Sequence, residues 1–344
     1  MSAERPGVSF VVPVHNGEAS LEAALTAILA QDDGRAIEVV VVEDGSRDGS
    51  SAIIERYASM GKIRVIEGPR RGAAAALNAG FRAARHAIVC QVDQDVIVGP
   101  GWMSQLVDAL SDPGVAAAQG YYVADVAANF WARVMGLDLE ERYGRLSGRF
   151  VDHVCTGNTA YRVEAILQVG LFDESFGYGY DNDMSYRLVP AGYRLAFCKE
   201  ARSVHRWRES GVTYLKQQYG VGFGRLDLVA KHRRRVRGDN VSGLTMILHA
   251  PLMLAALLAA SAAALFAVTS GPARPMVLLA AAVIVLLAAE RTIVGLLAWR
   301  RFRDPAGLWF APLHLLRDVA WAAAIVGWTA KRILGRPRRP SDSM

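Results

Sequence analysis

The sequence predicts an α/β domain with a doubly wound, mostly parallel sheet, followed by a region of long apolar helices. Three observations lead to this expectation. Short β-branched runs alternate with helix-patterned segments through the first part of the chain, which is typical of parallel strands joined by crossover helices. From Leu244 onward the composition changes to mainly Ala, Leu, Val and Ile. Polar residues stand at the ends of several predicted strands, where ligands bind in sheets of this kind.

The alternation can be followed along the chain. The first strand is expected at VSFVVPV (8–14), which is apolar on both faces, as a buried parallel strand should be. Residues 16–31 follow with apolar side chains at helical spacing. Further strands are expected at 37–46, 62–68 and 87–93, and further helices at 48–60, 73–85, 102–110 and 128–146. Residues 155–198 are expected to complete the same domain.

The last third of the chain is expected to associate with a membrane. The stretch from Leu244 to Ser270 contains no formal charge and is long enough to span a bilayer core of about 30 Å at about 1.5 Å per residue. A turn at 270–275 and a second apolar segment complete a hairpin. We therefore divide the chain into an α/β domain (1–230) and a membrane region (231–344), with helices at about 244–270, 275–299 and 307–330.

The third apolar segment carries charged and titratable residues near its middle. His314, Arg317 and Asp318 are costly in hydrocarbon. If this segment spanned the bilayer, the basic tail behind it would lie outside, against the positive-inside rule. We expect an interfacial or re-entrant helix, or else a third membrane helix, followed by a basic cytosolic tail.

The distribution of charge indicates which kind of partner the chain binds. The net charge is +6, and basic clusters at 231–237, 299–303 and 331–339 flank apolar segments, which favours an anionic membrane surface over nucleic acid. No nucleic-acid-binding signature is present. Three cysteines stand far apart and are expected to be reduced thiols: Cys90, Cys155 and Cys198. The N-terminus lacks the apolar core of a signal peptide, so the α/β domain is expected in the cytosol.

Two carboxylates one residue apart end the fourth predicted strand. Asp93 and Asp95 flank Gln94 and supply the oxygen ligands that a hard divalent cation prefers. Such a cation bridges a diphosphate and stabilises the charge on a departing nucleotide. A lone D-x-D triplet is also compatible with solvated loop charges. Its place at a strand end favours a ligand site.

The second predicted strand also ends in polar residues, within VEDGSRDGS (42–50). Asp44 is suited to accept hydrogen bonds from a nucleobase. Ser46 and Asp48 are suited to cap the next helix, and both roles are compatible. No G-x-G-x-x-G follows the first strand, which argues against a dinucleotide site.

In combination these motifs resemble those of the inverting family 2 glycosyltransferases, which have the Rossmann-like GT-A fold. The residues that carry the resemblance are VPVHN (12–16), VEDGSRDGS (42–50), LNAG (77–80), VDQD (92–95), TGN (156–158) and GYDNDMSYRL (179–188). The match covers roughly residues 8 to 225. The trailing hairpin resembles bacterial membrane-bound members that build exopolysaccharides or lipid-linked glycans, the succinoglycan glucosyltransferase type among them.

The resemblance implies a role for each matching position. Pro13, His15, Glu18 and Asp44 would line the nucleotide pocket, with Asp44 on the base, while Gly72 and Asn78 would border the ribose and phosphates. Asp93 would lie near the ribose, and Asp95 would ligate Mg²⁺ or Mn²⁺. Asp181 would be the general base that takes the proton of the acceptor hydroxyl. Two positions depart from the family pattern: His15 replaces a tyrosine, and Tyr180 replaces the glutamate of a Glu-Asp pair, which makes Asp183 the alternative base.

The chemistry of an inverting transfer agrees with one carboxylate base, because the sugar centre is displaced in line from the face opposite the leaving group. The same segment is compatible with a simple helix start capped by Asp181 or Asn182. Acceptor or phosphate contacts are expected at Asn158, Asp183, His205, Arg206, Gln218 and Arg225. For the basic residues among them, solvated surface charge is equally compatible.

These features predict a multi-pass hexosyltransferase of the bacterial inner membrane, with a cytoplasmic catalytic domain. It would pass a sugar from a UDP-linked donor to a hydroxyl of a lipid-linked or polysaccharide acceptor. Its partners would be the nucleotide-sugar, the acceptor and membrane lipids, with no nucleic acid. The main alternative is transfer to polyprenyl phosphate. A processive synthase, a nucleotidyltransferase and a non-catalytic nucleotide binder are further alternatives.

Overall fold

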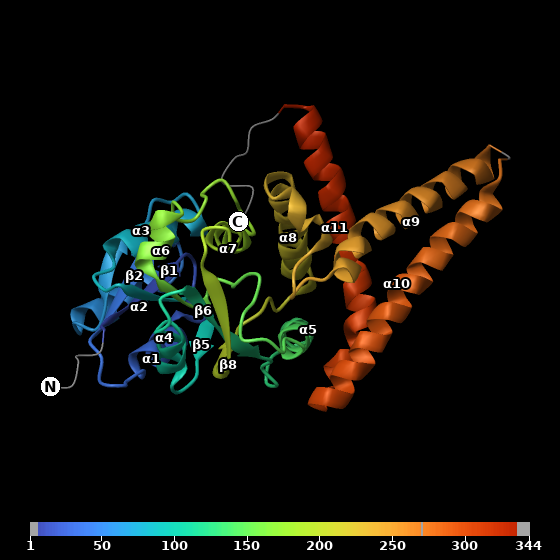
Figure 1. Ribbon diagram of the computed structural model, residues 1–344. Helices are drawn as coiled ribbons and strands as arrows, with labels where there is room; N and C mark the ends of the chain where they lie inside the picture. Colours follow the sequence, from blue (N-terminus) through green and yellow to red (C-terminus); the bar gives the residue numbers. More distant parts are fainter. Residues whose placement is uncertain (1–5, 270, 336–344) are drawn as a thin grey trace. The chain divides into compact units, whose positions relative to one another are not determined.

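The computed structural model describes residues 6–269 and 271–335 (Figure 1). These residues form two compact units. Unit 1 comprises residues 6–125 and 143–207, and unit 2 comprises residues 126–142 and 208–335. Most of the predicted basic tail, from residue 336 onward, lies outside the described residues, as does residue 270 of the predicted turn.

Unit 1 is built on an eight-stranded sheet with the order β3-β2-β1-β4-β7-β6-β8-β5. The strands are β1 (Val8–Val14), β2 (Ile37–Glu43), β3 (Arg64–Glu67), β4 (Ile88–Val92), β5 (Val96–Val98), β6 (Val115–Val123), β7 (Asn158–Arg162) and β8 (Arg194–His205). The pairs β1–β2, β2–β3, β1–β4 and β6–β8 are parallel. Strand β7 runs antiparallel to both β4 and β6, and β5 runs antiparallel to β8. The sheet is therefore mixed and mostly parallel, as predicted.

Helices connect these strands, the first four of them where the sequence predicted a helix and the other two within residues 155–198. They are α1 (Leu21–Leu29), α2 (Ser50–Ser59), α3 (Ala73–Ala83), α4 (Trp102–Ala109), α6 (Val163–Gln168) and α7 (Tyr180–Leu188). Helix α1 buries Leu21, Ala24, Leu25 and Ile28, the positions that share one face at a period of 3.6 residues. Strand β1 is buried along nearly its whole length, which explains its apolar sequence on both faces.

The parallel arrangement of β1, β2 and β4 decides where the polar loops lie. Because parallel strands end at the same edge of a sheet, the segments that follow these three strands meet there. They are residues 15–20, 44–49 and 93–95. These segments hold five of the candidate residues: His15, Glu18, Asp44, Asp93 and Asp95.

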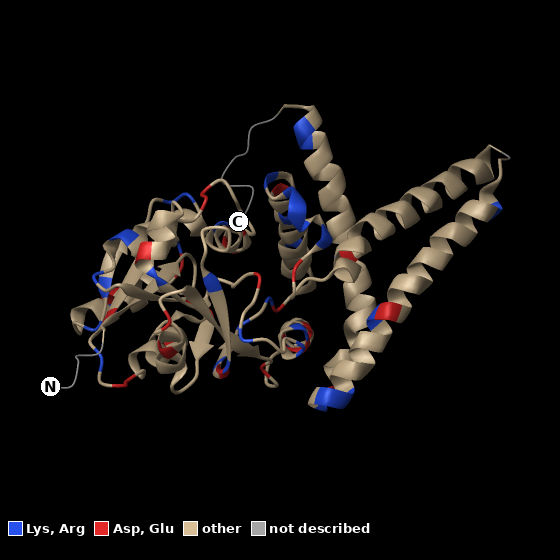
Figure 2. Cartoon of the chain, viewed as in Figure 1, with Lys and Arg blue, Asp and Glu red and all other residues tan. Residues whose placement is uncertain are grey.

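Unit 2 consists of helices. They are α5 (Phe130–Gly144), whose last two residues belong to unit 1, α8 (Gly211–Lys231), η1 (Arg233–Arg237), α9 (Leu244–Val268), α10 (Ala273–Phe302), η2 (Pro305–Trp309) and α11 (Phe310–Ile333). Within residues 6–269 and 271–335, three segments are long and apolar enough to cross a membrane: Leu244–Val268, Ala273–Phe302 and Pro305–Ile333. Their bounds agree with the predicted segments to within a few residues. In Figure 2, long stretches of α9 and α10 are tan, the colour of residues other than Lys, Arg, Asp and Glu.

The third apolar segment differs from the other two in its burial. Half of its most apolar window is buried, against 22% for each of the others. The residues that the sequence marked as costly in hydrocarbon are among those it buries, namely His314, Arg317 and Asp318. His314 and Asp318 have charged or titratable partners on neighbouring helices, and Arg317 is paired with Asp318 on its own helix. Burial therefore does not leave them as isolated charges.

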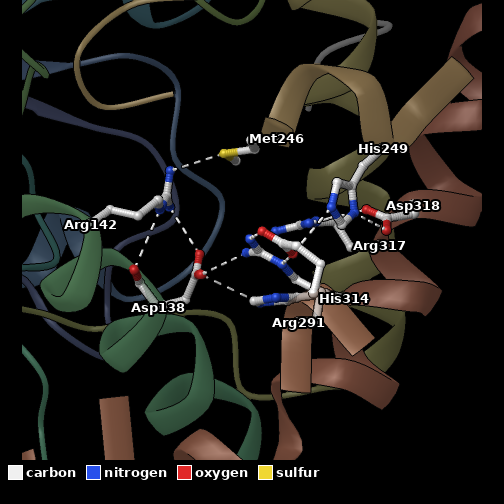
Figure 3. A network of polar contacts seen from close by, with 9 residues as sticks. Asp138, Arg142, Met246, His249, Arg291, His314, Arg317 and Asp318 are labelled. Carbon is white, nitrogen blue, oxygen red and sulfur yellow. Dashed lines mark hydrogen bonds and ion pairs between the residues drawn. The ribbon is translucent and has the colours of Figure 1, made fainter. Parts of the chain in front are cut away.

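A network of polar contacts joins four helices of unit 2 (Figure 3). His249 of α9 places Nδ1 2.7 Å from Oδ2 of Asp318 on α11, and Nε2 3.3 Å from Oε2 of Glu290 on α10. Asp318 also accepts a hydrogen bond from Arg317. Since carboxylates only accept hydrogen bonds, His249 donates from both ring nitrogens when it is doubly protonated. This histidine thereby links all three long apolar helices.

The same network reaches α5 through Asp138. Its carboxylate lies 3.1 Å from Arg142, 3.7 Å from Nε2 of His314 and 4.0 Å from Arg291. Burial by itself would raise the pKa of Asp138, but the surrounding cations outweigh it and hold that pKa well below its ordinary value. The buried charges of this network are thus paired with one another across four helices.

Candidate active site

Gln94, the middle residue of the D-Q-D triplet, ties the loop after β4 to the loop after β1. Its Oε1 accepts a hydrogen bond from the His15 backbone N–H at 2.9 Å, and its Nε2 donates to the His15 carbonyl at 3.0 Å. A Cβ on Gly17 would lie 2.4 Å from the Gln94 side-chain oxygen. Glycine at position 17 therefore permits the contact that holds the two loops together.

Asp93 is half-buried and packed against the loop before β7. Its Oδ1 accepts a hydrogen bond from Nε2 of Gln91 at 2.7 Å. Its Oδ2 lies 2.5 Å from the place that a Cβ on Gly157 would occupy, and Gly157 has φ +87°. Any side chain at position 157 would collide with this carboxylate and strain the backbone. Gly157 is therefore needed next to Asp93.

Asp95 lies beside the end of β8. Its Oδ1 is 3.6 Å from Nε2 of His205, and its backbone carbonyl accepts a hydrogen bond from the Arg206 N–H at 2.8 Å. The His205 ring stacks on the Trp207 ring, with 4.0 Å between the two ring centroids. The Arg206 guanidinium donates to the Ala19 carbonyl at 2.5 Å. The structure thus brings the predicted metal ligand and two predicted phosphate contacts together, with Arg206 joining β8 to the first loop.

Asp44 is buried where β2 ends. Its Oδ1 accepts a hydrogen bond from the Arg70 N–H at 2.6 Å, and its backbone carbonyl lies 3.1 Å from Nδ1 of His15. Burial raises the pKa of the Asp44 carboxyl above its ordinary value, while the Arg70 N–H and His15 act in the opposite direction. Pro13 is a half-buried residue of the adjacent strand β1.

The loops after β1 and β2 are fastened to each other by hydrogen bonds. The Glu18 carboxylate accepts from the Gly49 N–H at 3.0 Å, and the Glu18 N–H donates to Asp48 at 3.0 Å. Asp48 also accepts from the Ser50 N–H at the start of α2. The predicted capping by Ser46 and Asp48 is nevertheless wrong, because Gly49 occupies the N-cap position without a side-chain cap and the Ser46 hydroxyl accepts from the Asn16 N–H instead. Glu18 and Asp48 therefore both have structural partners in this pair of loops.

Gly72 and Asn78 lie at and within α3. Gly72 has φ +94° and precedes the helix, with open space where a Cβ would stand. Asn78 is buried; its amide donates to the Phe172 carbonyl at 2.9 Å and its Oδ1 accepts from the Phe172 N–H at 2.9 Å. The polar atoms of Asn78 are thus engaged with the segment before α7.

Asp181 lies in the first turn of α7, directly after Tyr180. It is half-buried, and its Oδ1 accepts a hydrogen bond from the Asn182 N–H at 2.9 Å. Desolvation raises the pKa of the Asp181 carboxyl, while His153 and the Thr156 N–H lower it in part. A raised pKa suits a carboxylate that takes up a proton during a reaction.

Asp183, the alternative base, has a different environment. It is fully buried, and its Oδ2 lies 2.8 Å from the Arg187 guanidinium. The same guanidinium donates to the carbonyls of Val169 and Leu171. This arrangement fastens α7 to the end of α6, and it leaves Asp181 as the stronger candidate for the base.

Tyr180 stands close to the acidic residues. Burial raises the pKa of its phenol well above the ordinary value, and the nearby charges of Asp93 and Asp181 raise that pKa further. Tyr180 is therefore neutral over the working range of an enzyme. It supplies a hydroxyl at the position where the resemblance in sequence would place a second carboxylate.

The remaining predicted contacts lie apart from one another along the chain. Asn158 is buried at the start of β7 and accepts a hydrogen bond from the Trp102 indole at 2.5 Å. Gln218 and Arg225 are half-buried on α8 in unit 2. Arg225 donates to the Arg235 carbonyl at 3.1 Å and lies 3.6 Å from Asp239. Both of these Arg225 contacts are with residues of unit 2.

The acidic residues at this edge of unit 1 fit a divalent cation for which the protein supplies only some of the ligands. Among residues 6–269 and 271–335, no group of three or more His, Cys, Asp or Glu side chains could hold a metal ion. Asp95 offers carboxylate oxygens beside Asp93 at a strand end. Mg²⁺-type ions commonly bind through one or two carboxylates, with substrate phosphates and water as the other ligands. Asp95 and Asp93 fit that mode.

Sequence reasoning missed Gln91 and Gln119 as residues of this region. Both are fully buried in strands, and both hold the loop before β7. The available signal was a polar residue inside an otherwise apolar strand run, as in IVCQV. Such residues need a hydrogen-bond partner when buried, but the sequence does not say which one.

Known proteins resemble this chain in sequence. Residues 9–170 match the family described as Glycosyl transferase family 2. The chain is 28% identical over 346 residues to Pre-mycofactocin glycosyltransferase of Mycobacterium tuberculosis, covering 95% of this chain and 68% of that protein. It is 29% identical over 264 residues to Succinoglycan biosynthesis protein ExoA of Rhizobium meliloti, covering 72% of this chain and 77% of that protein.

One solved structure is similar over nearly the whole chain. It is the mannosyltransferase PcManGT from Pyrobaculum calidifontis in complex with GDP-Man and Mn²⁺. The TM-score is 0.61 at 22% sequence identity, and the alignment covers 97% of this chain and 88% of that one. At this identity the likeness is one of fold. It agrees with the predicted α/β domain followed by apolar helices.

Proposed function

We propose, from the premise that this chain is a glycosyltransferase of family 2, that it transfers a sugar from a UDP-linked donor to an acceptor hydroxyl with inversion. The acceptor is a lipid-linked glycan or polysaccharide at the cytosolic face of the bacterial inner membrane. The observation that carries the proposal is the position of Asp44, Asp93 and Asp95 at the ends of β2 and β4. The Tyr180 phenol interacts electrostatically with both Asp93 and Asp181.

Each residue has a part in the proposed reaction. Asp44 receives the nucleobase, while Asp93 and Asp95 face the ribose and diphosphate. A bound Mg²⁺ or Mn²⁺ would neutralise charge on the departing diphosphate. Asp181 accepts the proton of the acceptor hydroxyl as the oxygen bonds to the anomeric carbon and the bond to the nucleotide diphosphate breaks. PcManGT, which was solved with GDP-Man and Mn²⁺, supports a metal-assisted reaction.

The proposed membrane location rests on unit 2. Its three long apolar helices suit a lipid environment. The cations Arg233, Arg234 and Arg237 are exposed shortly before the first of these helices, and such clusters favour the cytosolic leaflet. The similarity to a succinoglycan biosynthesis protein supports an acceptor in surface polysaccharide assembly.

Nucleotide release by the full chain in nanodiscs tests the proposal. The protein is given a panel of UDP- and GDP-sugars with Mn²⁺, with and without a bacterial lipid extract. Release that requires metal, lipid and one UDP-sugar supports it, and release from no donor contradicts it. A lipid-phosphate sugar that still forms in Asp181→Asn would identify polyprenyl phosphate as the acceptor, since a phosphate needs no base.

A further inference from the structure

Two buried glutamines lie on either side of strand β7, which begins next to the candidate site. Gln91 lies on β4 and Gln119 lies on β6, the two neighbours of β7. Both are paired with Thr159 of β7, one from each side. Both are 0% exposed. A buried amide in a sheet interior is costly unless its donors and acceptors are used, so the partners of these two side chains matter.

Both glutamines hold the loop before β7, but only one also holds an acidic residue of the site. Gln119 Oε1 accepts a hydrogen bond from the Cys155 N–H at 2.7 Å. Gln91 Oε1 accepts from the Gly157 N–H, and Gln91 Nε2 donates to the Asp93 carboxylate at 2.7 Å. The two side chains are therefore a natural pair: one supports the loop alone, and the other supports the loop and Asp93.

The chemistry of its partners gives the Gln91 amide a single orientation. A carboxylate only accepts hydrogen bonds and a backbone N–H only donates them, so the amide oxygen faces Gly157 and the nitrogen faces Asp93. A hydrogen bond to a charged group is stronger than a neutral one. Gln91 thus fixes one carboxylate oxygen, while the other lies against Gly157.

The loop that Gln91 holds continues to the candidate base. The Val154 N–H donates to the Ser185 hydroxyl at 3.1 Å, and that hydroxyl donates to the Asp181 carbonyl at 2.8 Å. The Thr156 N–H stabilises the Asp181 carboxylate. The loop therefore contacts the Asp93 side through Gly157 and the Asp181 side through Thr156.

We propose that Gln91 is a positioning residue, which aims the Asp93 carboxylate at the nucleotide of the donor and keeps it in register with the loop that supports Asp181. This inference rests on the proposed function, in which Asp93 faces the donor. Gln119 is the matched comparison, because it supports the same loop without touching Asp93.

Nucleotide binding by two matched variants tests the proposal. Gln91→Met and Gln119→Met each replace an amide by an unbranched side chain that offers only a weak acceptor and no donor. The full chain in detergent is titrated with UDP and with GDP in the presence of Mn²⁺ by calorimetry, and donor KM and kcat are measured separately. Thermal unfolding shows how much each variant loses in stability.

Only Gln91→Met should weaken nucleotide binding strongly. Loss of the hydrogen bond to the charged Asp93 carboxylate should lower the affinity for the nucleotide roughly ten- to a hundredfold. The KM for the donor should rise as well. Gln119→Met should keep the nucleotide affinity within about twofold and lower only kcat and the unfolding temperature. If Gln91→Met does not fold, Gln91→Asn replaces it, because it keeps a neutral buried amide that is one methylene shorter and so cannot span the contacts to both Gly157 and Asp93.

Three results would overturn the inference. The first is unchanged nucleotide affinity in the Gln91 variant, and the second is an equal loss in the Gln91 and Gln119 variants. The third is a wild-type chain that binds neither UDP nor GDP with Mn²⁺, which would overturn the proposed function and this inference with it. The first two leave the proposed function standing, so the failures are distinguishable.

Discussion

Gln94 and His15 hold each other by two hydrogen bonds of opposite direction, across the adjacent ends of β4 and β1. The distances are 2.9 and 3.0 Å, and both bonds use the amide of Gln94 and the backbone of His15. The middle residue of the D-Q-D triplet therefore fixes the loop, while the carboxylates on either side of it are left for other partners.

Replacing Gln94 should loosen that edge of the sheet. Gln94→Ala removes both hydrogen bonds to His15, and at roughly 1 kcal/mol each the free energy of unfolding should fall by about 2 kcal/mol. Nucleotide affinity should fall with it, because Asp93 and Asp95 lose their fixed position. Thermal unfolding and nucleotide titration measure the two effects. An unaltered unfolding temperature would show that the two bonds contribute nothing to stability.

Asp95 should govern the metal dependence of the reaction. Asp95→Ala removes the carboxylate proposed to bind the cation, so turnover should fall by at least about a hundredfold at limiting Mn²⁺. A Mn²⁺ titration of activity measures this effect. His205→Ala, which removes the ring 3.6 Å away, is the matched comparison and should have a smaller effect. Equal Mn²⁺ dependence in Asp95→Ala and wild type would refute the assignment.

The pH profile should report the raised pKa of Asp181. A base must be deprotonated to act, so kcat should fall as the pH decreases through the pKa of Asp181. Because desolvation raises this pKa above the ordinary 3.8, the acid limb of the profile should lie above that value. His153 lowers the Asp181 pKa, so His153→Gln should move the acid limb to higher pH. A limb that stays in place or moves down would contradict the assignment.

The buried network of unit 2 should be a main source of that unit's stability. Asp318→Asn removes the charge that faces His249 at 2.7 Å and Arg317 at 3.1 Å. Breaking a buried ion pair from one side costs about 3–5 kcal/mol. The unfolding temperature of the full chain in detergent should therefore fall clearly. Glu290→Gln, at a side chain that is 31% exposed, should lower it less, and the reverse order would be inconsistent with the network.

Much of the fold could be predicted because its signals are local. Strands β1, β2 and β4 are short runs rich in β-branched residues, and α1 has apolar residues at helical spacing. The gathering of Asp44, Asp93 and Asp95 follows from parallel strand order alone. The three apolar segments were evident from composition, since α9 and α10 lack the polar face of a surface helix.

The parts that could not be predicted depend on contacts between residues far apart in the sequence. Strand β7 enters the sheet antiparallel between β4 and β6, and no local pattern specifies that pairing. The roles of Gln91 and of Asn78, which bonds to Phe172 94 residues away, follow from such pairings. The sequence likewise showed that Arg317 and Asp318 would be costly to place in hydrocarbon. It did not show that His249, 69 residues before Asp318, contacts it.

The most direct test of the central claim is a single-turnover comparison of wild type, Asp181→Asn and Asn182→Ala with the donor and lipid acceptor found in the nucleotide-release screen. Each protein is also titrated with nucleotide and Mn²⁺. The account predicts that Asp181→Asn binds nucleotide like wild type but loses at least about a hundredfold in the rate of transfer, while Asn182→Ala retains most of it. Transfer by Asp181→Asn at the wild-type rate, with the same glycoside product, would contradict a base at position 181.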